Sequence, residues 1–335
     1  MELNREEERK RERFFTFPKS LRRLYTLQRK VRFGLMPWLS GDPMFEKDWI
    51  VEAENLLGFD SIFVTDHLAG GLEALTKLSA LSTITNHVRL GTIVLNAPLR
   101  NPVLLANMAA TIDIISSGRL ELGLGAGYLE QEFQACGIPF LEPKARIEQL
   151  EEAISIIIEL WEKGRLNFHG KYYTMKGAVC PKPRQEPHPP LIIGGKGEKL
   201  LLKLAARCAD ICNLPHTSLE ETKHKLRVLK NHCLRAGRHF EEIEVSWFGI
   251  AIVSKSHEEL EKEIETLCKL APERYPDPQT ARQRAIIGMP EQCRERINEY
   301  MEAGISYFIL HFPKKDEARL FCREVLPRVR NLKYR

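Results

Sequence analysis

The chain has 335 residues, of which 43% are hydrophobic and 28% charged, a composition typical of a soluble globular protein. No window reaches the roughly 18 uninterrupted apolar residues that a membrane-spanning helix needs, and the first residues lack the apolar segment of a signal peptide. Eight cysteines without a Cys-x-x-Cys pair are too sparse for a disulfide scaffold. They predict a reduced, cytoplasmic compartment.

The formal net charge of +5 is concentrated at the N-terminus. Residues 1–30 contain ten Lys or Arg and five Glu, so this extension accounts for the whole excess of positive charge. A basic arm of this kind could contact nucleic acid or another acidic partner. Glu and Arg interleaved at helical spacing favour instead a solvated or packed amphipathic helix, which makes nucleic acid an unlikely partner.

From residue 31 onward, patterns typical of strands and helices alternate. The strand-like runs are continuously apolar, as expected when both faces of a parallel sheet are buried. Eight strands, each followed by a helix, predict an α/β fold, a (β/α)₈ TIM barrel with insertions over residues 31–335. The predicted strands are 31–36, 59–64, 88–95, 119–125, 191–195, 209–214, 244–253 and 305–312. The predicted helices are 47–57, 72–86, 102–116, 145–163, 198–208, 218–236, 258–270, 291–303 and 316–325.

Two segments interrupt this repeat. Residues 164–190 hold five prolines and an aromatic pair, which predicts a small hairpin followed by a loop. Residues 272–290 predict a mostly irregular excursion before a helix. Because long excursions in compact domains are usually lids or binding loops, residues 272–290 are a candidate for completing a substrate pocket.

Polar residues and glycines follow several predicted strands. The second strand leads into Asp66 and His67, the third into Asn96, and the fourth ends at Gly125. In a barrel of this type, the active site lies at the carboxyl ends of the strands. The sequence therefore predicts one functional site at that end of the barrel.

The sequence GGKGEK after the fifth strand is a candidate phosphate-binding loop. Backbone N–H groups and a helix dipole could hold a phosphate there, and Lys196 would add positive charge. The alternative is a tight turn that needs glycine for its backbone conformation. A third glycine and the lysines exceed what a turn requires, so we favour phosphate.

The sequence GLGAGYLE has only part of a dinucleotide-binding fingerprint, because Tyr128 stands where the last glycine belongs and the first strand does not precede it. His67 could exchange a proton at neutral pH, although a histidine satisfied by a loop carbonyl is an equal alternative from this residue alone. We expect no metal site, since no metal-ligand spacing accompanies His67. A nucleophilic serine elbow and paired carboxylates are also missing.

These residues resemble the bacterial-luciferase-like superfamily, and within it the coenzyme F420-dependent oxidoreductase branch is the most similar. The resemblance covers residues 31–312 in the same order. It is carried by VTDHL (64–68), RLGTIVLNAPLRNPVLLA (89–106), DIISSGRLELGLGAGYLEQEF (113–133), HPPLIIGGKGEK (188–199), AARCADICNL (205–214) and GMPEQCRERINEYMEAGISYFIL (288–310).

The resemblance implies a (β/α)₈ barrel and a role for each strand end. In several F420-dependent members, the Asp-His pair after the second strand lies at the deazaflavin ring, which implies that His67 is catalytic and that Asp66 orients it. A bulge with a non-prolyl cis peptide often backs the ring, and Ile93–Val94 is the expected bond. The expected cofactor-binding residues are Thr92, Ile93, Val94, Asn96, Gly125, Gly127, Tyr128, Gly194, Gly195, Lys196 and Gly197.

Two departures argue against oxidation of a sugar phosphate. Tyr128 stands where F420-dependent sugar-phosphate dehydrogenases carry a Glu, and the loop of residues 68–71 lacks their Trp. Since F420 has an acidic tail, a basic groove would favour it over FMN. Arg100, Arg282 and Arg284 are the candidates for such a groove.

The first hypothesis is an oxidoreductase that exchanges a hydride between coenzyme F420 and a small organic substrate, with His67 moving the accompanying proton. The second keeps the barrel but uses reduced FMN and dioxygen, as in a two-component monooxygenase that needs a reductase partner. The third is a non-catalytic cofactor-binding protein whose basic arm is the working part. A homodimer is expected from the resemblance.

Overall fold

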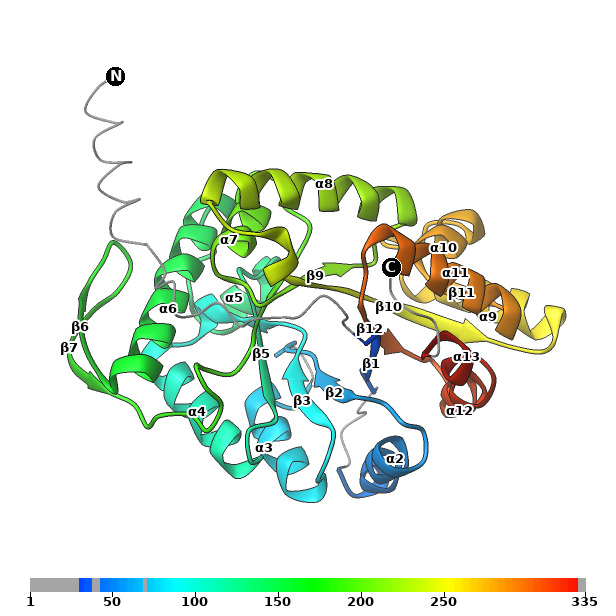
Figure 1. The fold of residues 1–335 in the computed structure, drawn as a ribbon, viewed down its shortest axis with the longest axis horizontal. Coiled ribbons are helices and arrows are strands. Elements are labelled where there is room, and N and C mark those ends of the chain that lie inside the picture. Colours follow the sequence, from blue (N-terminus) through cyan, green and yellow to red (C-terminus); the bar gives the residue numbers. More distant parts are fainter. Residues whose placement is uncertain (1–29, 38–42, 69–70, 331–335) are drawn as a thin grey trace.

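The structure is a computed structural model that describes residues 30–37, 43–68 and 71–330 (Figure 1). The charged extension predicted over residues 1–30 lies outside the described residues, except for Lys30.

Eight parallel strands close into a barrel, which confirms the predicted (β/α)₈ fold. Each strand pairs in parallel with its neighbour, β9 pairs with β10, and the last strand, β12, returns to pair with β1. The burial of the strands on both faces agrees with their continuous apolar sequences. The barrel strands are β1 (Arg32–Leu35), β2 (Ser61–Val64), β3 (Arg89–Thr92), β5 (Leu120–Gly125), β8 (Leu191–Gly194), β9 (Ile211–Pro215), β10 (Glu244–Val253) and β12 (Tyr307–His311).

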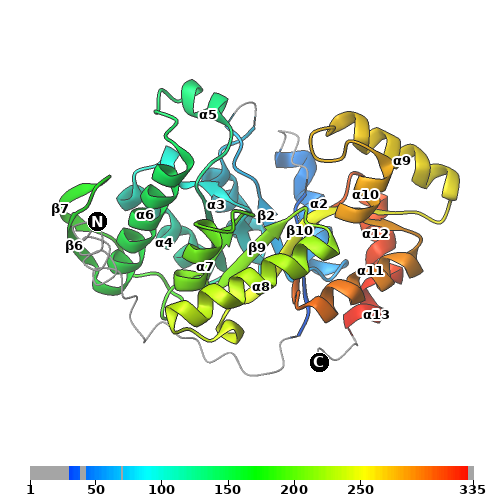
Figure 2. The ribbon, with the colours of Figure 1, turned by 90° about the horizontal axis from the view of Figure 1, so that it is seen from above.

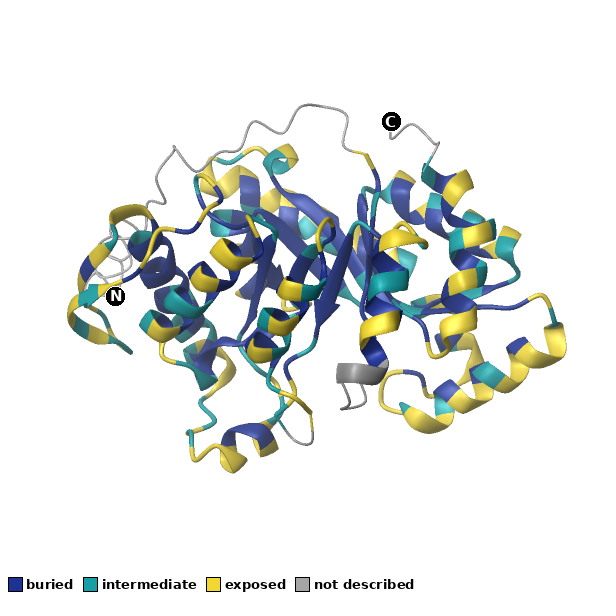
Figure 3. Ribbon diagram, turned by 90° about the horizontal axis from the view of Figure 1, so that it is seen from below, coloured by how far each residue is buried: buried dark blue, intermediate teal, exposed yellow. Residues whose placement is uncertain are grey.

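Helices cover the outside of the barrel, with their polar faces toward solvent (Figure 3). Every predicted helix is present, although α7 begins at Leu201 and not at residue 198, because residues 198–200 form a turn. The helices are α2 (Pro43–Asn55), α3 (Ala74–Ile84), α4 (Pro102–Ile115), α5 (Glu130–Ala135), α6 (Pro143–Lys163), α7 (Leu201–Cys208), α8 (Leu219–Ala236), α9 (His257–Leu270), α10 (Pro278–Arg284), α11 (Pro290–Ala303), α12 (Lys315–Glu324) and α13 (Leu326–Arg330).

Of the predictions for the two insertions, one is confirmed and one is wrong. The predicted hairpin is confirmed as β6 (Arg165–His169) paired antiparallel with β7 (Thr174–Val179), beyond α6 at one end of the molecule (Figure 2). The irregular excursion predicted over residues 272–290 is wrong, because it contains α10 and the short strand β11 (Ile286–Gly288). Asp277 caps α10 by accepting the N–H of Thr280 at 2.8 Å, and β11 pairs with the outer half of β10.

The middle of the barrel is filled by side chains from several of its strands. Phe63 of β2 lies across the interior, where a Cβ at Gly34 or Gly91 would stand 3.0 Å or 2.2 Å from its ring. The two neighbouring strands therefore need glycine at these positions. Around the ring, a buried cluster plugs the barrel with Met36, Ile93, Ile192, Ile211, Tyr307 and Ile309.

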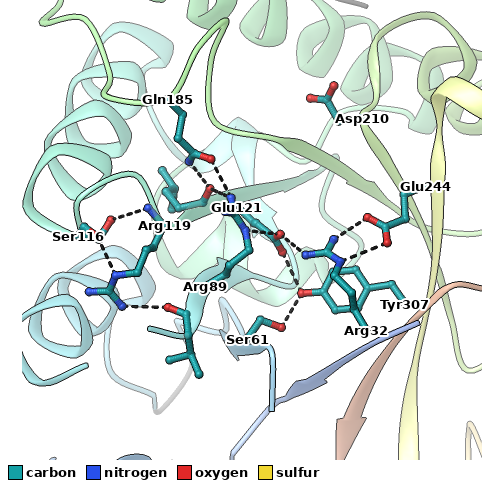
Figure 4. Close-up of polar contacts among 12 residues, drawn as sticks. Arg32, Ser61, Arg89, Ser116, Arg119, Glu121, Gln185, Asp210, Glu244 and Tyr307 are labelled. Atoms are coloured by element: carbon teal, nitrogen blue, oxygen red, sulfur yellow. Dashed lines mark hydrogen bonds and ion pairs between the residues drawn. The ribbon is translucent and has the colours of Figure 1, made fainter. Parts of the chain in front are cut away.

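A buried polar network closes the amino-terminal end of the barrel (Figure 4). Glu121 of β5 accepts hydrogen bonds from Arg32 at 2.7 Å and Arg89 at 2.6 Å, and from the Tyr307 hydroxyl at 2.9 Å. Arg32 also pairs with Glu244 at 2.5 Å. The network thus joins the first residues of five barrel strands around the carboxylate of Glu121, whose side chain is 1% exposed.

The charge of Glu121 is maintained by its partners. Burial alone would raise the pKa of this carboxyl, but the attraction of Arg32 and Arg89 and their hydrogen bonds outweigh burial and hold the pKa at about 2. The carboxylate therefore stays ionised inside the barrel at every pH at which the protein is expected to work.

We expect the network to make the free energy of unfolding depend on pH in the acid range. The folded pKa of Glu121 lies below its ordinary value of 4.5, so its stabilising free energy is complete above that pH and is lost as the pH falls toward 2. The shift corresponds to roughly 3 kcal/mol. Urea unfolding of Glu121→Gln should show a large loss of stability near neutral pH and a smaller difference from the wild type near pH ~3. Glu295→Gln removes an exposed carboxylate as the control, and identical pH profiles for wild type and Glu121→Gln would contradict the assignment.

Candidate active site

The third barrel strand is interrupted at its carboxyl end. β3 ends at Thr92, β4 (Leu95–Asn96) resumes pairing with β5, and the peptide Ile93–Val94 between them is cis, as predicted. The Thr92 hydroxyl bridges the gap by donating to the carbonyl of Gly123 and accepting its N–H, both at 2.9 Å. Thr92 is completely buried. It therefore supports the bulge from inside the wall and does not line the mouth of the barrel.

Val94 rests against the glycines of two neighbouring strands. An added Cβ would lie 2.7 Å from Val94 at Gly125 of β5 and 2.7 Å from Val94 at Gly194 of β8. Ile93, by contrast, points into the buried cluster of the barrel interior. The cis bulge thus presents one half-buried valine over a wall that only glycine can form.

Asp66 lies at the end of β2 but does not hold His67, so the orienting contact expected between them is wrong. Its carboxylate receives two hydrogen bonds from Arg100, at 2.6 and 2.8 Å, and the backbone N–H of Asn96 at 2.8 Å. Arg100 also contacts Glu73 at 2.8 Å. These bonds tie the end of β2 to the segment after the bulge, and they occupy Arg100, which was a candidate for a basic groove.

His67 contacts a carboxylate that the sequence analysis did not single out. Its Nδ1 lies 2.9 Å from Oε1 of Glu132, the third residue of α5. The Tyr128 ring meets the imidazole edge-on, with 6.3 Å between ring centroids. The His67 side chain is 47% exposed and that of Glu132 only 5%, so the histidine faces the mouth while its partner lies behind it.

Asn96 is a buried amide without a partner. It is 5% exposed, and neither Oδ1 nor Nδ2 has a hydrogen-bond partner among the described residues. Its amide lies under Gly127, where a Cβ would approach Oδ1 to 2.4 Å. Gly127 has a positive φ of 71°, so a side chain is disfavoured there on both counts. A buried amide left unpaired is costly and is a position at which a ligand group could bind.

The predicted phosphate loop follows β8 directly. Gly195 has a φ of 144°, and residues 195–200 separate β8 from α7. Lys196 reaches solvent beside Arg274 and Arg284, with which it lines a hollow of about 480 Å³. Desolvation lowers the pKa of Lys196; the attraction of Glu221 opposes this, and repulsion from Arg284 and Arg274 adds to it. Of the other candidate arginines, Arg282 pairs with Glu261 on the outside and does not line this hollow.

His216, at the end of β9, is the second histidine at the mouth and was missed from sequence. It is 7% exposed, and its Nδ1 lies 2.7 Å from the hydroxyl of Tyr275. Burial lowers its pKa well below the ordinary value, and the positive charges of Arg274 and Lys196 lower it further. In the order of the barrel strands, β9 stands opposite β2. His216 therefore lies on the opposite side of the mouth from His67.

The described residues contain neither a metal-binding cluster nor a membrane-spanning helix. Within residues 30–37, 43–68 and 71–330, no group of three His, Cys, Asp or Glu side chains is placed to hold a metal ion. No helix in the same part of the chain has both the length and the apolar character needed to cross a membrane.

The chain belongs to the luciferase-like monooxygenase family, whose sequence profile matches residues 32–307. The resemblance found from sequence motifs is thereby confirmed. F420-dependent glucose-6-phosphate dehydrogenases are among its relatives. That of Microbacterium testaceum is 31% identical over 317 residues, which cover 84% of this chain and 92% of the relative. That of Kribbella flavida is 29% identical over 319 residues, covering 85% and 94%.

Solved structures show the same fold. The coenzyme F420-dependent tetrahydromethanopterin reductase from Methanopyrus kandleri superposes with a TM-score of 0.77 at 21% identity, over 90% of this chain and 99% of that chain. An F420-dependent secondary alcohol dehydrogenase with a bound F420-acetone adduct gives 0.79 at 24% identity, over 90% and 100%. Long-chain alkane monooxygenase gives 0.77 at 16% identity, over 90% and 92%. The barrel is therefore shared by F420-dependent enzymes and monooxygenases.

The packing of Val94 predicts different costs of substitution at Gly194, which ends β8, and at Gly197, which lies in the loop after it. Gly194→Ala places a methyl group 2.7 Å from Val94 and should lower the free energy of unfolding by about 1–3 kcal/mol. Gly197→Ala meets only an ordinary contact of 3.6 Å and should change it by less than about 0.5 kcal/mol. Urea unfolding of both variants measures the difference, and equal effects would contradict the close packing of Val94.

Proposed function

We propose that this protein is a coenzyme F420-dependent oxidoreductase that exchanges a hydride with a small anionic organic substrate. The observation that carries the proposal is the arrangement of the mouth: a flat wall of Val94 over Gly125 and Gly194, followed by a glycine loop and cationic side chains. F420-dependent relatives over more than four fifths of the chain support the choice of cofactor.

The residues present fit a tricyclic ring with a phosphorylated tail. Val94 and the glycines beside it provide a surface on which a ring can lie, and the unpaired amide of Asn96 can hydrogen-bond a polar group of the cofactor. The backbone N–H of Gly195 already donates to the carbonyl of Asn213 at 3.1 Å, so the N–H of Gly197 and the side chain of Lys196 would hold the phosphate. Bound F420 would supply the atom that accepts or donates the hydride. Tyr128, which is 64% exposed, would cover the ring region beside His67.

In this arrangement His67 is the catalytic residue and Asp66 has a supporting role. His67 faces the mouth and can take the proton of a substrate hydroxyl when the hydride leaves the adjacent carbon, or return it in the reverse direction. Asp66 keeps Asn96 and Arg100 in place behind the bulge. Both the tricyclic surface and the proton acceptor are therefore positioned by the end of β2.

The anionic character of the substrate follows from the hollow beside Lys196. Arg274 is exposed and lies near Lys196 and Arg284, and neutral His216 borders the same group. Glu273 also lines the hollow and Glu221 pairs with Arg284 at 2.8 Å, so Arg274 is the cation that we propose attracts a phosphate or carboxylate. The relatives are named for a phosphorylated sugar, but Tyr128 and the loop of residues 68–71 differ from their pattern, so we propose a different anionic alcohol or carbonyl compound.

The second candidate function is a two-component monooxygenase that uses reduced FMN. It is favoured by the family itself and by the fold shared with long-chain alkane monooxygenase. It would require a separate reductase as a partner. The predicted homodimer and cytoplasmic location are compatible with either function and stay predictions.

Cofactor titration separates the two functions. We expect the purified protein to bind F420 with micromolar affinity and FMN at least tenfold more weakly, because relatives that cover more than four fifths of the chain are named as F420-dependent. Quenching of the intrinsic fluorescence of each cofactor measures the two affinities. Tighter binding of FMN would move the protein to the monooxygenases, and binding of neither would overturn both proposals.

Arg274 should bind the anionic end of the substrate. With F420 bound, so that the phosphate loop is filled, inorganic phosphate should raise the melting temperature of the wild type. Arg274→Ala should need about tenfold more phosphate for the same rise in melting temperature. This corresponds to a loss of about 1.4 kcal/mol in the free energy of phosphate binding. Lys203→Ala removes one positive charge from an exposed position of α7 and is the matched control. Equal responses of Arg274→Ala and the wild type would contradict an anion site at this hollow.

A further inference from the structure

The pairing of His67 with Glu132 restricts the protonation of the imidazole. Oε1 of Glu132 lies 2.9 Å from Nδ1, and the carboxylate comes from a helix 65 residues further along the chain. An ionised carboxylate only accepts hydrogen bonds, so Nδ1 must carry the proton of this contact. In the neutral ring, Nε2 is then the nitrogen with a free electron pair.

The other carboxylate near the end of β2 cannot do this. Asp66 is adjacent to His67 in sequence, but both of its oxygens are occupied by Arg100, and one of them also by the N–H of Asn96. Glu132, which is 5% exposed, is placed behind the imidazole because Gly127 turns the chain and Phe133 is buried beside it. Tertiary structure has thus supplied a carboxylate from α5 to a histidine on β2.

We propose that Glu132 is the positioning residue of His67. It holds the imidazole in the tautomer protonated at Nδ1 and so makes Nε2 the atom that exchanges a proton with the substrate. The role of this exchange in catalysis rests on the proposed function, whereas the tautomer is a property of the protein without cofactor or substrate.

The proposed step balances in atoms and charge. When an alcohol is oxidised, its C–H bond breaks and the hydride leaves for the bound cofactor, while the O–H bond breaks and its proton goes to Nε2. The electron pair of the O–H bond forms the carbonyl. The imidazolium that results has Glu132 against its Nδ1–H, which stabilises the positive charge. In the reductive direction, Nε2 returns the proton to the forming hydroxyl.

Nitrogen NMR of protein labelled with ¹⁵N-histidine tests the tautomer directly in the cofactor-free protein. The His67 signals are assigned by their loss in His67→Ala. We expect the wild type to show a protonated Nδ1 and an unprotonated Nε2 at mildly alkaline pH. Glu132→Ala should convert His67 to the Nε2-protonated form that a free imidazole prefers, and Glu132→Met, which keeps the side-chain volume, should do the same.

Glu130→Ala is the matched control, because it removes an exposed carboxylate from the same helix and should leave the His67 signals unchanged. Protonation of Nε2 in the wild type, or an unchanged tautomer in a folded Glu132 variant, would overturn the proposal. Either result is independent of the cofactor titration. A failure here therefore differs from a failure of the proposed function, which the F420 and FMN affinities decide.

Discussion

The fold depends on one buried carboxylate, Glu121, at the amino-terminal end of the barrel. Desolvating a charge is costly, so Glu121 is tolerated only because cations from β1 and β3 and a hydroxyl from β12 reach it together. Tyr307 also contacts Ser61 of β2, and Arg32 contacts Glu244 of β10. These bonds can form at the same time only when the barrel is closed, because their strands are distant in sequence. The network therefore specifies closure and strand order.

With that end closed by polar bonds and the middle filled by Phe63 and its neighbours, the opposite end is left for ligands. The shape of this end depends on positions that lack a side chain as well as on the side chains present. Val94 can lean over two strands only because Gly125 and Gly194 carry no Cβ. The Thr92 hydroxyl replaces the backbone hydrogen bonds that the bulge removes, by bonding to the carbonyl and N–H of Gly123, so the bulge after β3 does not open the barrel. A rigid wall beside a loop of glycines and cations is the consequence.

Much of this arrangement could be predicted from sequence. The eight strands read as apolar runs because both of their faces are buried, and the cis peptide at Ile93–Val94 followed from the resemblance of its neighbours to a family. The irregular excursion predicted for residues 272–290 is wrong, because this segment contains a short helix and a short strand. Pro278 in fact occupies the first turn of α10, where its missing N–H costs nothing, and Asp277 caps that helix.

Hydrophobic period and glycine placement are local properties of the chain, so the residue types at the ends of the strands can be predicted without the fold. The sequence therefore located His67, the bulge and the loop at Gly194. Which charged side chains meet depends on the folded barrel. Asp66 and His67 are adjacent in sequence yet bind different partners. His67, which follows β2, is brought together with Glu132 of α5. Side-chain pairing across a barrel depends on strand order and helix placement, which no local pattern contains.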